Sequence, residues 1–145
     1  FAESKLVGNR NYGNKIWNMA RFLAMLSENT YDLKITENLG DLEKLNPAML
    51  KNHLEFISNI NSKMDKFLLS EAAEDIHSYV WHQVADIYIE QAKDDKELLP
   101  LINFIFKDCL KALHPFMPFV TEEIWQQIYA TNKDMLLAKS EFPQY

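Results

Sequence analysis

Apolar side chains recur along this chain at alternating spacings of four and three residues, and this period constrains the fold more than any other feature of the sequence. The clearest series is Tyr12, Ile16, Met19, Leu23 and Leu26. Side chains with these spacings lie on one face of an α-helix, because about 3.6 residues complete each turn. We therefore expect a helix over residues 9–26 with one buried face.

Three further apolar series predict the remaining long helices. Asn46 before Pro47 is a typical helix start, with a capping side chain followed by proline in the first turn. Ser70 is expected to cap the next helix in the same way. The series are Leu50, Leu54, Ile57, Ile60, Met64, Phe67 and Leu68; Ala73, Ile76, Val80, Val84 and Ile87; and Leu98, Ile102, Ile105, Phe106, Cys109, Leu110 and Leu113. The last is the most apolar and is expected to lie at the centre.

The segment from His114 to Trp125 contains two prolines, Pro115 and Pro118. Proline cannot continue a helix interior, so this segment is expected to end one helix and form a packed corner. Thr121 is expected to cap a last short helix, with Glu122 and Glu123 in its positively polarised first turn.

These helices predict an all-α fold, an antiparallel helical bundle of four to five helices. Residues 1–130 are expected to form the bundle, and residues 131–145 an irregular tail that leads toward a C-terminal region outside this chain. Residues 27–46 and 93–97 are expected to be polar connections. A length of 145 residues, of which 48% are apolar, suits one domain with a sizeable core.

Composition excludes several function classes. The chain has three glycines, none spaced for a glycine-rich phosphate loop, and no apolar run long enough to cross a bilayer. Its one cysteine, Cys109, cannot form an internal disulfide and is expected to be a buried thiol in a reducing cytoplasm. The formal net charge of −6 argues against a self-sufficient nucleic-acid binder, although one basic face can still meet phosphate.

No catalytic or metal site is expected. Glu74 and His77 form one Glu-x-x-His element, whereas a di-iron bundle needs two such elements and two more inward glutamates. No nucleophile turn of the kind used in Ser-His-Asp hydrolases is present. His77 is therefore interpreted as a surface or capping histidine.

One helix face has an unusual composition. Between Lys5 and Arg21 the chain has four basic residues and no acidic residue. At about 100° per residue, six side chains share one arc opposite the buried face: Arg10, Asn11, Asn14, Lys15, Asn18 and Arg21. We call this set the polar strip. Its amide and cationic groups could contact RNA bases and phosphates, with Phe22 or Tyr31 stacking a base, or they could form an ordinary solvated face. Composition leaves both readings open.

Three motifs resemble one protein family. Residues 8–22, Gly-Asn-Arg-Asn-Tyr-Gly-Asn-Lys-Ile-Trp-Asn followed by Ala20, Arg21 and Phe22, resemble the Arg-Asn-Phe-x-Asn-Lys-Leu-Trp-Asn-x-x-Arg-Phe helix of class I aminoacyl-tRNA synthetases. Val80-Trp81 and the run from Asp86 to Lys93 resemble that family's Asp-x-Tyr-Ile-Glu helix. The segment from His114 to Trp125 resembles its His-Pro-Phe-Met-Pro-Phe corner. The motifs occur in the family's order and span nearly the whole chain.

The resemblance is to the anticodon-binding domain of the valine, isoleucine and leucine group, and the motifs are most similar to the valyl enzymes. It implies a segment of a cytoplasmic, monomeric ligase that charges tRNA with valine using ATP and Mg²⁺. The implied partners are the tRNA anticodon stem-loop and the rest of the synthetase chain, with no membrane. The family's His-x-Gly-His and Lys-Met-Ser-Lys-Ser nucleotide motifs are absent, so no cofactor is expected in this segment.

Two alternatives stay open at this point. The segment could come from an isoleucyl or leucyl enzyme, or it could be a helical protein-docking bundle without RNA contact. If the RNA reading is right, the tRNA-binding residues are Arg10, Asn11, Asn14, Lys15, Asn18, Arg21, Phe22 and Tyr31.

Overall fold

The computed structural model describes residues 2–28, 38–129 and 136–145, with the side chains of residues 10–27 in the first of these segments. The described residues form helices and contain no strand. The elements are α1 (Ala2–Glu28), α2 (Leu39–Leu45), α3 (Pro47–Asp65), α4 (Leu69–Ser78), a π-helix η1 (Tyr79–Tyr88), α5 (Ile89–Asp94), a short 3₁₀ turn η2 (Lys96–Leu98), α6 (Leu99–Leu113), α7 (Pro118–Ile128) and a second 3₁₀ turn η3 (Leu137–Lys139).

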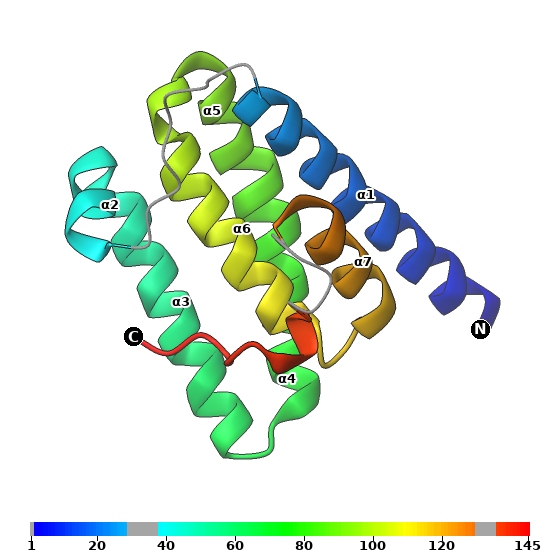
Figure 1. Cartoon of the computed structure of the whole chain (residues 1–145). Coiled ribbons are helices and arrows are strands. Elements are labelled where there is room, and N and C mark those ends of the chain that lie inside the picture. Colours follow the sequence, from blue (N-terminus) through cyan, green and yellow to red (C-terminus); the bar gives the residue numbers. More distant parts are fainter. Residues whose placement is uncertain (1, 29–37, 130–135) are drawn as a thin grey trace.

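Five long segments make up the bundle. α4, η1 and α5 follow one another without a break and form a single rod. α1, α3, this rod, α6 and α7 alternate in direction, and α6 lies among the others (Figure 1). The prediction of an antiparallel all-α bundle of four to five helices is therefore confirmed. The short α2 lies within residues 27–46, where the sequence predicted only a polar connection.

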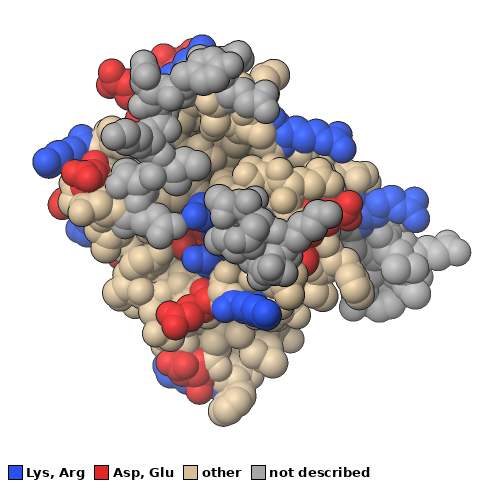
Figure 2. Space-filling view, viewed as in Figure 1, with Lys and Arg blue, Asp and Glu red and all other residues tan. Residues whose placement is uncertain are grey.

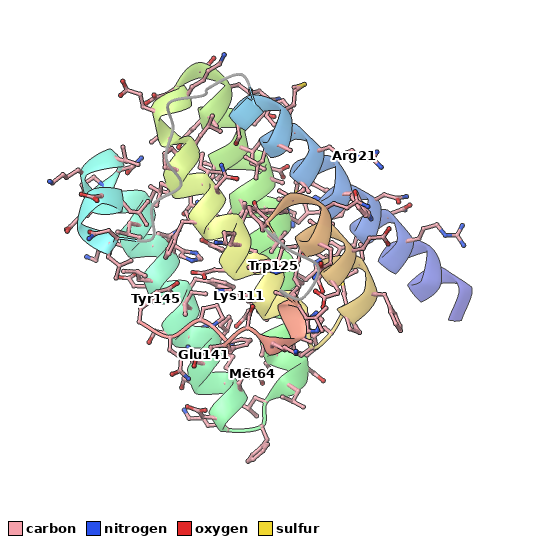
Figure 3. The ribbon with its side chains drawn as sticks, in the orientation of Figure 1. Arg21, Met64, Lys111, Trp125, Glu141 and Tyr145 are labelled. Carbon is pink, nitrogen blue, oxygen red and sulfur yellow. The ribbon has the colours of Figure 1, made fainter. Side chains whose placement is uncertain are left out.

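The hydrophobic core is built around α6. All of its residues are buried except Lys107 and Lys111. These two lysines lie on the side of α6 that faces α7, with their Nζ atoms 5.6 and 5.8 Å from the centroid of the Trp125 ring. Figure 3 shows Lys111 beside Trp125. Cys109 is fully buried, as predicted, and burial raises the pKa of its thiol. Such a largely apolar helix is stable in this position because its neighbours cover it everywhere except along the side of the two lysines.

One polar cluster lies inside the core. His53 of α3 and Asp108 of α6 are buried, with His53 Nε2 2.8 Å from Asp108 Oδ2 and His53 Nδ1 2.7 Å from the Tyr79 hydroxyl. Burial raises the pKa of Tyr79, so its hydroxyl stays protonated and can donate to Nδ1. The cluster links α3, η1 and α6, and it satisfies groups that would be costly to bury alone.

The helix starts differ from those predicted at two places. Asn46 caps α3 as expected, accepting a hydrogen bond from the Met49 backbone N–H at 3.1 Å. Ser70 does not cap α4, because that helix begins at Leu69 and has no side-chain cap. Thr121 does not cap α7, which begins at Pro118; its hydroxyl instead donates to the Met117 carbonyl at 2.8 Å.

Because α7 starts three residues earlier than predicted, Glu122 and Glu123 lie beyond its first turn. The prediction that they interact with the positive end of the helix dipole is therefore wrong. Glu122 has another partner: its Oε2 accepts a hydrogen bond of 2.7 Å from the Leu137 backbone N–H. Proline at the first helical position explains the early start, since its fixed φ suits a helix and its missing N–H costs nothing there.

Two apolar series also end differently. The α3 series was expected to reach Phe67 and Leu68, but α3 ends at Asp65, and the Phe67 side chain is 85% exposed. Phe67 has a φ of 59°, in the left-handed region that turns the chain back sharply. In the rod, Ile87 is 43% exposed and Tyr88 is buried instead. The wider i→i+5 turn of the π-helix rotates the side chains away from the 3.6-residue period.

The described part of the C-terminal tail is attached to the bundle. It runs across α3 (Figure 1), and the buried side chain of Leu137 anchors its beginning. Asn61 Nδ2 donates to the Pro143 carbonyl at 2.7 Å. The Tyr145 hydroxyl lies 3.0 and 2.9 Å from the two carboxylate oxygens of Asp108 and donates to them. The tail thus ends on the buried polar cluster.

Candidate nucleic-acid interface

The polar strip lies on the solvent-facing side of α1. Arg10, Asn11, Asn14, Asn18 and Arg21 are exposed. The opposite side of the helix, which carries the predicted series from Tyr12 to Leu26, is buried in the core. Figure 3 shows Arg21 pointing away from the bundle, and Figure 2 shows basic side chains projecting at the α1 edge. The bundle therefore holds the strip on a helix that leaves its arginines and asparagines in solvent.

The charges of the two arginines at the ends of the strip are available to an anionic ligand. Neither Arg10 nor Arg21 forms an ion pair with any carboxylate that the structure describes. The Arg21 guanidinium carbon lies 5.4 Å from the centroid of the Trp17 ring. An arginine held beside an aromatic ring can still offer its N–H groups to a phosphate or a base edge.

Lys15 is in a different environment from the arginines. Its Nζ lies 3.2 Å from Asp86 Oδ1 and 3.9 Å from the centroid of the Trp81 ring. The Lys15 side chain is 26% exposed and the Asp86 side chain 53%. The ammonium group is thus neutralised within the chain and is held against η1. Of the three described cations of the strip, Lys15 alone has a carboxylate partner within the described residues.

The structure describes only one of the two aromatic residues that were predicted to stack an RNA base. Phe22 is half-buried and packs against the core, with Lys93 Nζ 5.2 Å from the centroid of its ring. Tyr31 lies outside the described residues. Trp17 was not among the predicted site residues, yet it lies on α1 with Arg10, Asn14 and Arg21 at successive spacings of four, three and four residues. That spacing was visible in the sequence and would have identified Trp17.

An aromatic stack lies beside the strip, between α1 and the rod. The Tyr12 ring lies parallel to His77, with centroids 3.9 Å apart, and 5.8 Å from Trp81. Desolvation on burial, together with the nearby His82, lowers the pKa of His77, so its ring is neutral near pH 7. The stack fixes α1 against the rod and places Trp81 beneath Lys15.

The described residues contain no group of three His, Cys, Asp or Glu side chains that could hold a metal ion. His77, the histidine of the Glu-x-x-His element, stacks on Tyr12. The His53 side chain of the His53–Asp108 pair is completely buried, so a substrate cannot reach it from solvent. Among the described residues no helix is both long and apolar enough to cross a membrane.

Comparison with known proteins assigns the chain to a family. Residues 47–145 match the family model described as the anticodon-binding domain of tRNA ligase. A valine–tRNA ligase of Bacillus thuringiensis subsp. konkukian is 33% identical over 95% of this chain and 17% of its own length. Those of Carboxydothermus hydrogenoformans and Petrotoga mobilis are 31% and 32% identical, over 95% and 94% of this chain and 16% of their own lengths.

The match to the family model includes α3, the rod, α6 and α7, and the relatives are similar over nearly the whole chain, α1 included. The chain spans about one sixth of the length of these relatives, 16–17%. The family model covers residues 47–145, and the all-helical bundle agrees with it. The chain belongs to the family of anticodon-binding domains of tRNA ligases.

Proposed function

We propose that this chain recognises the anticodon stem-loop of a valine tRNA through the polar strip of α1, as one segment of a valine–tRNA ligase. The observation that carries the proposal is an exposed helix face with three asparagines, no acidic residue and two arginines that form no ion pair with a described carboxylate. An ordinary solvated helix face mixes both signs of charge. The similarity of α1 and the rest of the chain to valine–tRNA ligases supports the choice of RNA as its ligand.

Each kind of side chain on the strip suits a different part of an RNA loop. Arg10 and Arg21 can contact phosphates or the edge of guanine, and asparagine can form a bidentate contact with adenine. Trp17 offers a ring on which an unpaired base can stack beside Arg21. Phe22, at the other edge of the strip, stays a proposed contact, and so does Tyr31, which lies outside the described residues. Lys15 contributes less than the arginines, since Asp86 already neutralises it.

The remaining roles belong to the complete ligase. We infer that it acts as a monomer in the cytoplasm and charges tRNA with valine, using ATP and Mg²⁺ bound outside these residues. No part of this segment is assigned to ATP. Valine–tRNA ligases reject threonine only weakly by binding alone, which is a general reason for such enzymes to hydrolyse mischarged products at a second site.

A binding titration tests the proposal. Valine tRNA transcripts with the native and with altered anticodons are titrated against the chain at two salt concentrations. We expect binding that depends on the anticodon and weakens with salt, because each neutralised phosphate releases counterions. Binding that ignores the anticodon would contradict the proposal and favour a protein-docking face.

Two variants locate the contact on α1. Arg10→Ala and Arg21→Ala should each weaken binding by about 1–3 kcal/mol if the arginine contacts a base. The melting temperature should stay unchanged, since both side chains are exposed. Lys51→Ala, which removes an exposed lysine of α3, is the matched control and should leave the affinity unchanged.

A further inference from the structure

A second surface, next to the stack of Tyr12 and His77, has no role in the proposed function. A groove of about 470 Å³ opens where α1 and α4 meet the segment between α6 and α7. Its walls include Tyr12, His77, Leu113, Phe116, Met117 and Phe119. We call it the corner groove. α1 passes close to its floor, since a Cβ atom added to Gly13 would lie 3.9 Å from Met117 Cε.

The corner groove has no charged side chain in its walls. Its only titratable groups are Tyr12 and His77. Burial raises the pKa of Tyr12 and lowers that of His77, so both are neutral near pH 7. A surface for an RNA backbone needs cations to neutralise phosphates. The lining of the corner groove suits an apolar protein surface instead.

The rim of the groove exposes a large aromatic side chain. Phe119, the second residue of α7, is 89% exposed, whereas other side chains of α7 such as Ile124 and Trp125 are buried. A phenylalanine left in water loses the favourable free energy that burial of its ring would give. An exposed aromatic beside an uncharged groove is typical of an interface with another protein surface.

We propose that the corner groove is the docking site for an apolar segment from the remaining part of the same ligase chain. The proposal rests on the proposed function, because it takes these residues to be one part of a longer ligase. The relatives support it: this chain spans only 16–17% of their length, so most of each relative lies outside the matched residues. The N-terminal end of α1 lies on the same side of the bundle as the start of α7 (Figure 1).

A docked apolar segment in the corner groove explains why the bundle has one basic, polar surface and one uncharged, apolar surface. The polar strip faces solvent and has two arginines that pair with no described carboxylate, as a surface for RNA requires. The corner groove is uncharged and has an exposed ring, as a contact within one chain requires. Docking through the groove would hold α1 at a fixed position relative to the rest of the ligase and would leave the strip accessible.

Hydroxyl-radical footprinting tests the proposal, since it reports the solvent accessibility of Met and Phe side chains. The complete ligase and the 145-residue chain are oxidised in parallel. We expect Met117 and Phe119 to react at least fivefold more slowly in the complete ligase. Phe67, which is 85% exposed and lies outside the groove, is the internal control and should react at the same rate in both.

Matched variants of the complete ligase identify the groove as the contact. Phe119→Ser should restore the oxidation of Met117 toward the rate in the 145-residue chain, whereas Phe67→Ser should not. Equal oxidation of Met117 in both wild-type proteins would overturn the proposal. Protection that appears in the 145-residue chain as its concentration rises would also overturn it and would indicate a second copy; protection on adding tRNA would indicate RNA.

The test is independent of the RNA assignment. Phe119→Ser should leave the affinity of the 145-residue chain for the anticodon stem-loop unchanged. If docking fails, the anticodon titration still stands; if the titration fails while Met117 is protected in the complete ligase, the strip assignment is wrong and the docking site remains.

Discussion

At the scale of single residues, the surroundings of a cation decide whether it can reach RNA. Arg21 projects into solvent from α1, whereas Lys15, six residues earlier on the same helix, is held by Asp86 and Trp81. A list of basic residues on a helical wheel treats the two alike. Only the position of the rod beside α1 distinguishes them.

Asp86→Asn tests this difference. Removing the carboxylate should free the Lys15 ammonium for an RNA phosphate, so the chain should bind tRNA more tightly at low salt. The slope of log K against log[salt] should steepen by about 0.7–0.9 for one additional phosphate contact. Lys15→Ala in the original chain should change the affinity little. A large loss on Lys15→Ala would show that the ion pair opens on binding.

His77 gives the fold a dependence on pH. Its pKa is lowered in the folded chain by desolvation and by the neighbouring His82, so the unfolded chain binds more protons below the ordinary pKa of about 6.5. The free energy of unfolding should therefore fall as pH drops below that value. Denaturant titrations between pH 7.5 and 5 should show a smaller fall in His77→Gln. An unchanged pH dependence in that variant would contradict the assignment.

At the scale of helices, a sequence signal predicts a helix cap correctly where the cap does not depend on tertiary contacts. Both Asn46 and Ser70 were predicted to be caps, but only Asn46 accepts a backbone hydrogen bond. Asn46→Ala should lower the free energy of unfolding by about 1 kcal/mol. Ser70→Ala should change it by less than about 0.5 kcal/mol, as an exposed substitution without a specific contact does. Equal losses in chemical denaturation would show that Ser70 does cap α4.

The sequence predicted the number, order and inward faces of the long helices, because their apolar period is a local property. It did not predict that Ile87 is exposed, since the π-helix depends on how the rod packs and no side-chain pattern marks it. The exposed strip on α1 could be predicted from its spacing, and Trp17 could have been. The pairing of Lys15 with Asp86 could not, because it joins residues 71 positions apart.

At the scale of the whole molecule, the tail and the core depend on each other. The Tyr145 hydroxyl donates to the Asp108 carboxylate, which also contacts His53 of α3. Tyr145→Phe removes only this hydroxyl. Because the Tyr145 side chain is partly exposed, we expect a loss of about 1 kcal/mol in the free energy of unfolding, at the lower end for a bond to a charged group. No change in thermal denaturation would mean that the tail does not stabilise the bundle.

The central claim is that the solvent-facing side of α1 contacts the anticodon loop, and photo-crosslinking tests it most directly. A benzophenone side chain is introduced in place of Asn14, at the middle of the strip, and in a second variant in place of Ser58, an exposed residue of α3. With bound valine tRNA, the account predicts that the probe at position 14 crosslinks to nucleotides of the anticodon loop and the probe at position 58 does not. Crosslinks from position 58 alone, or crosslinks from position 14 that lie outside the anticodon arm, would contradict it.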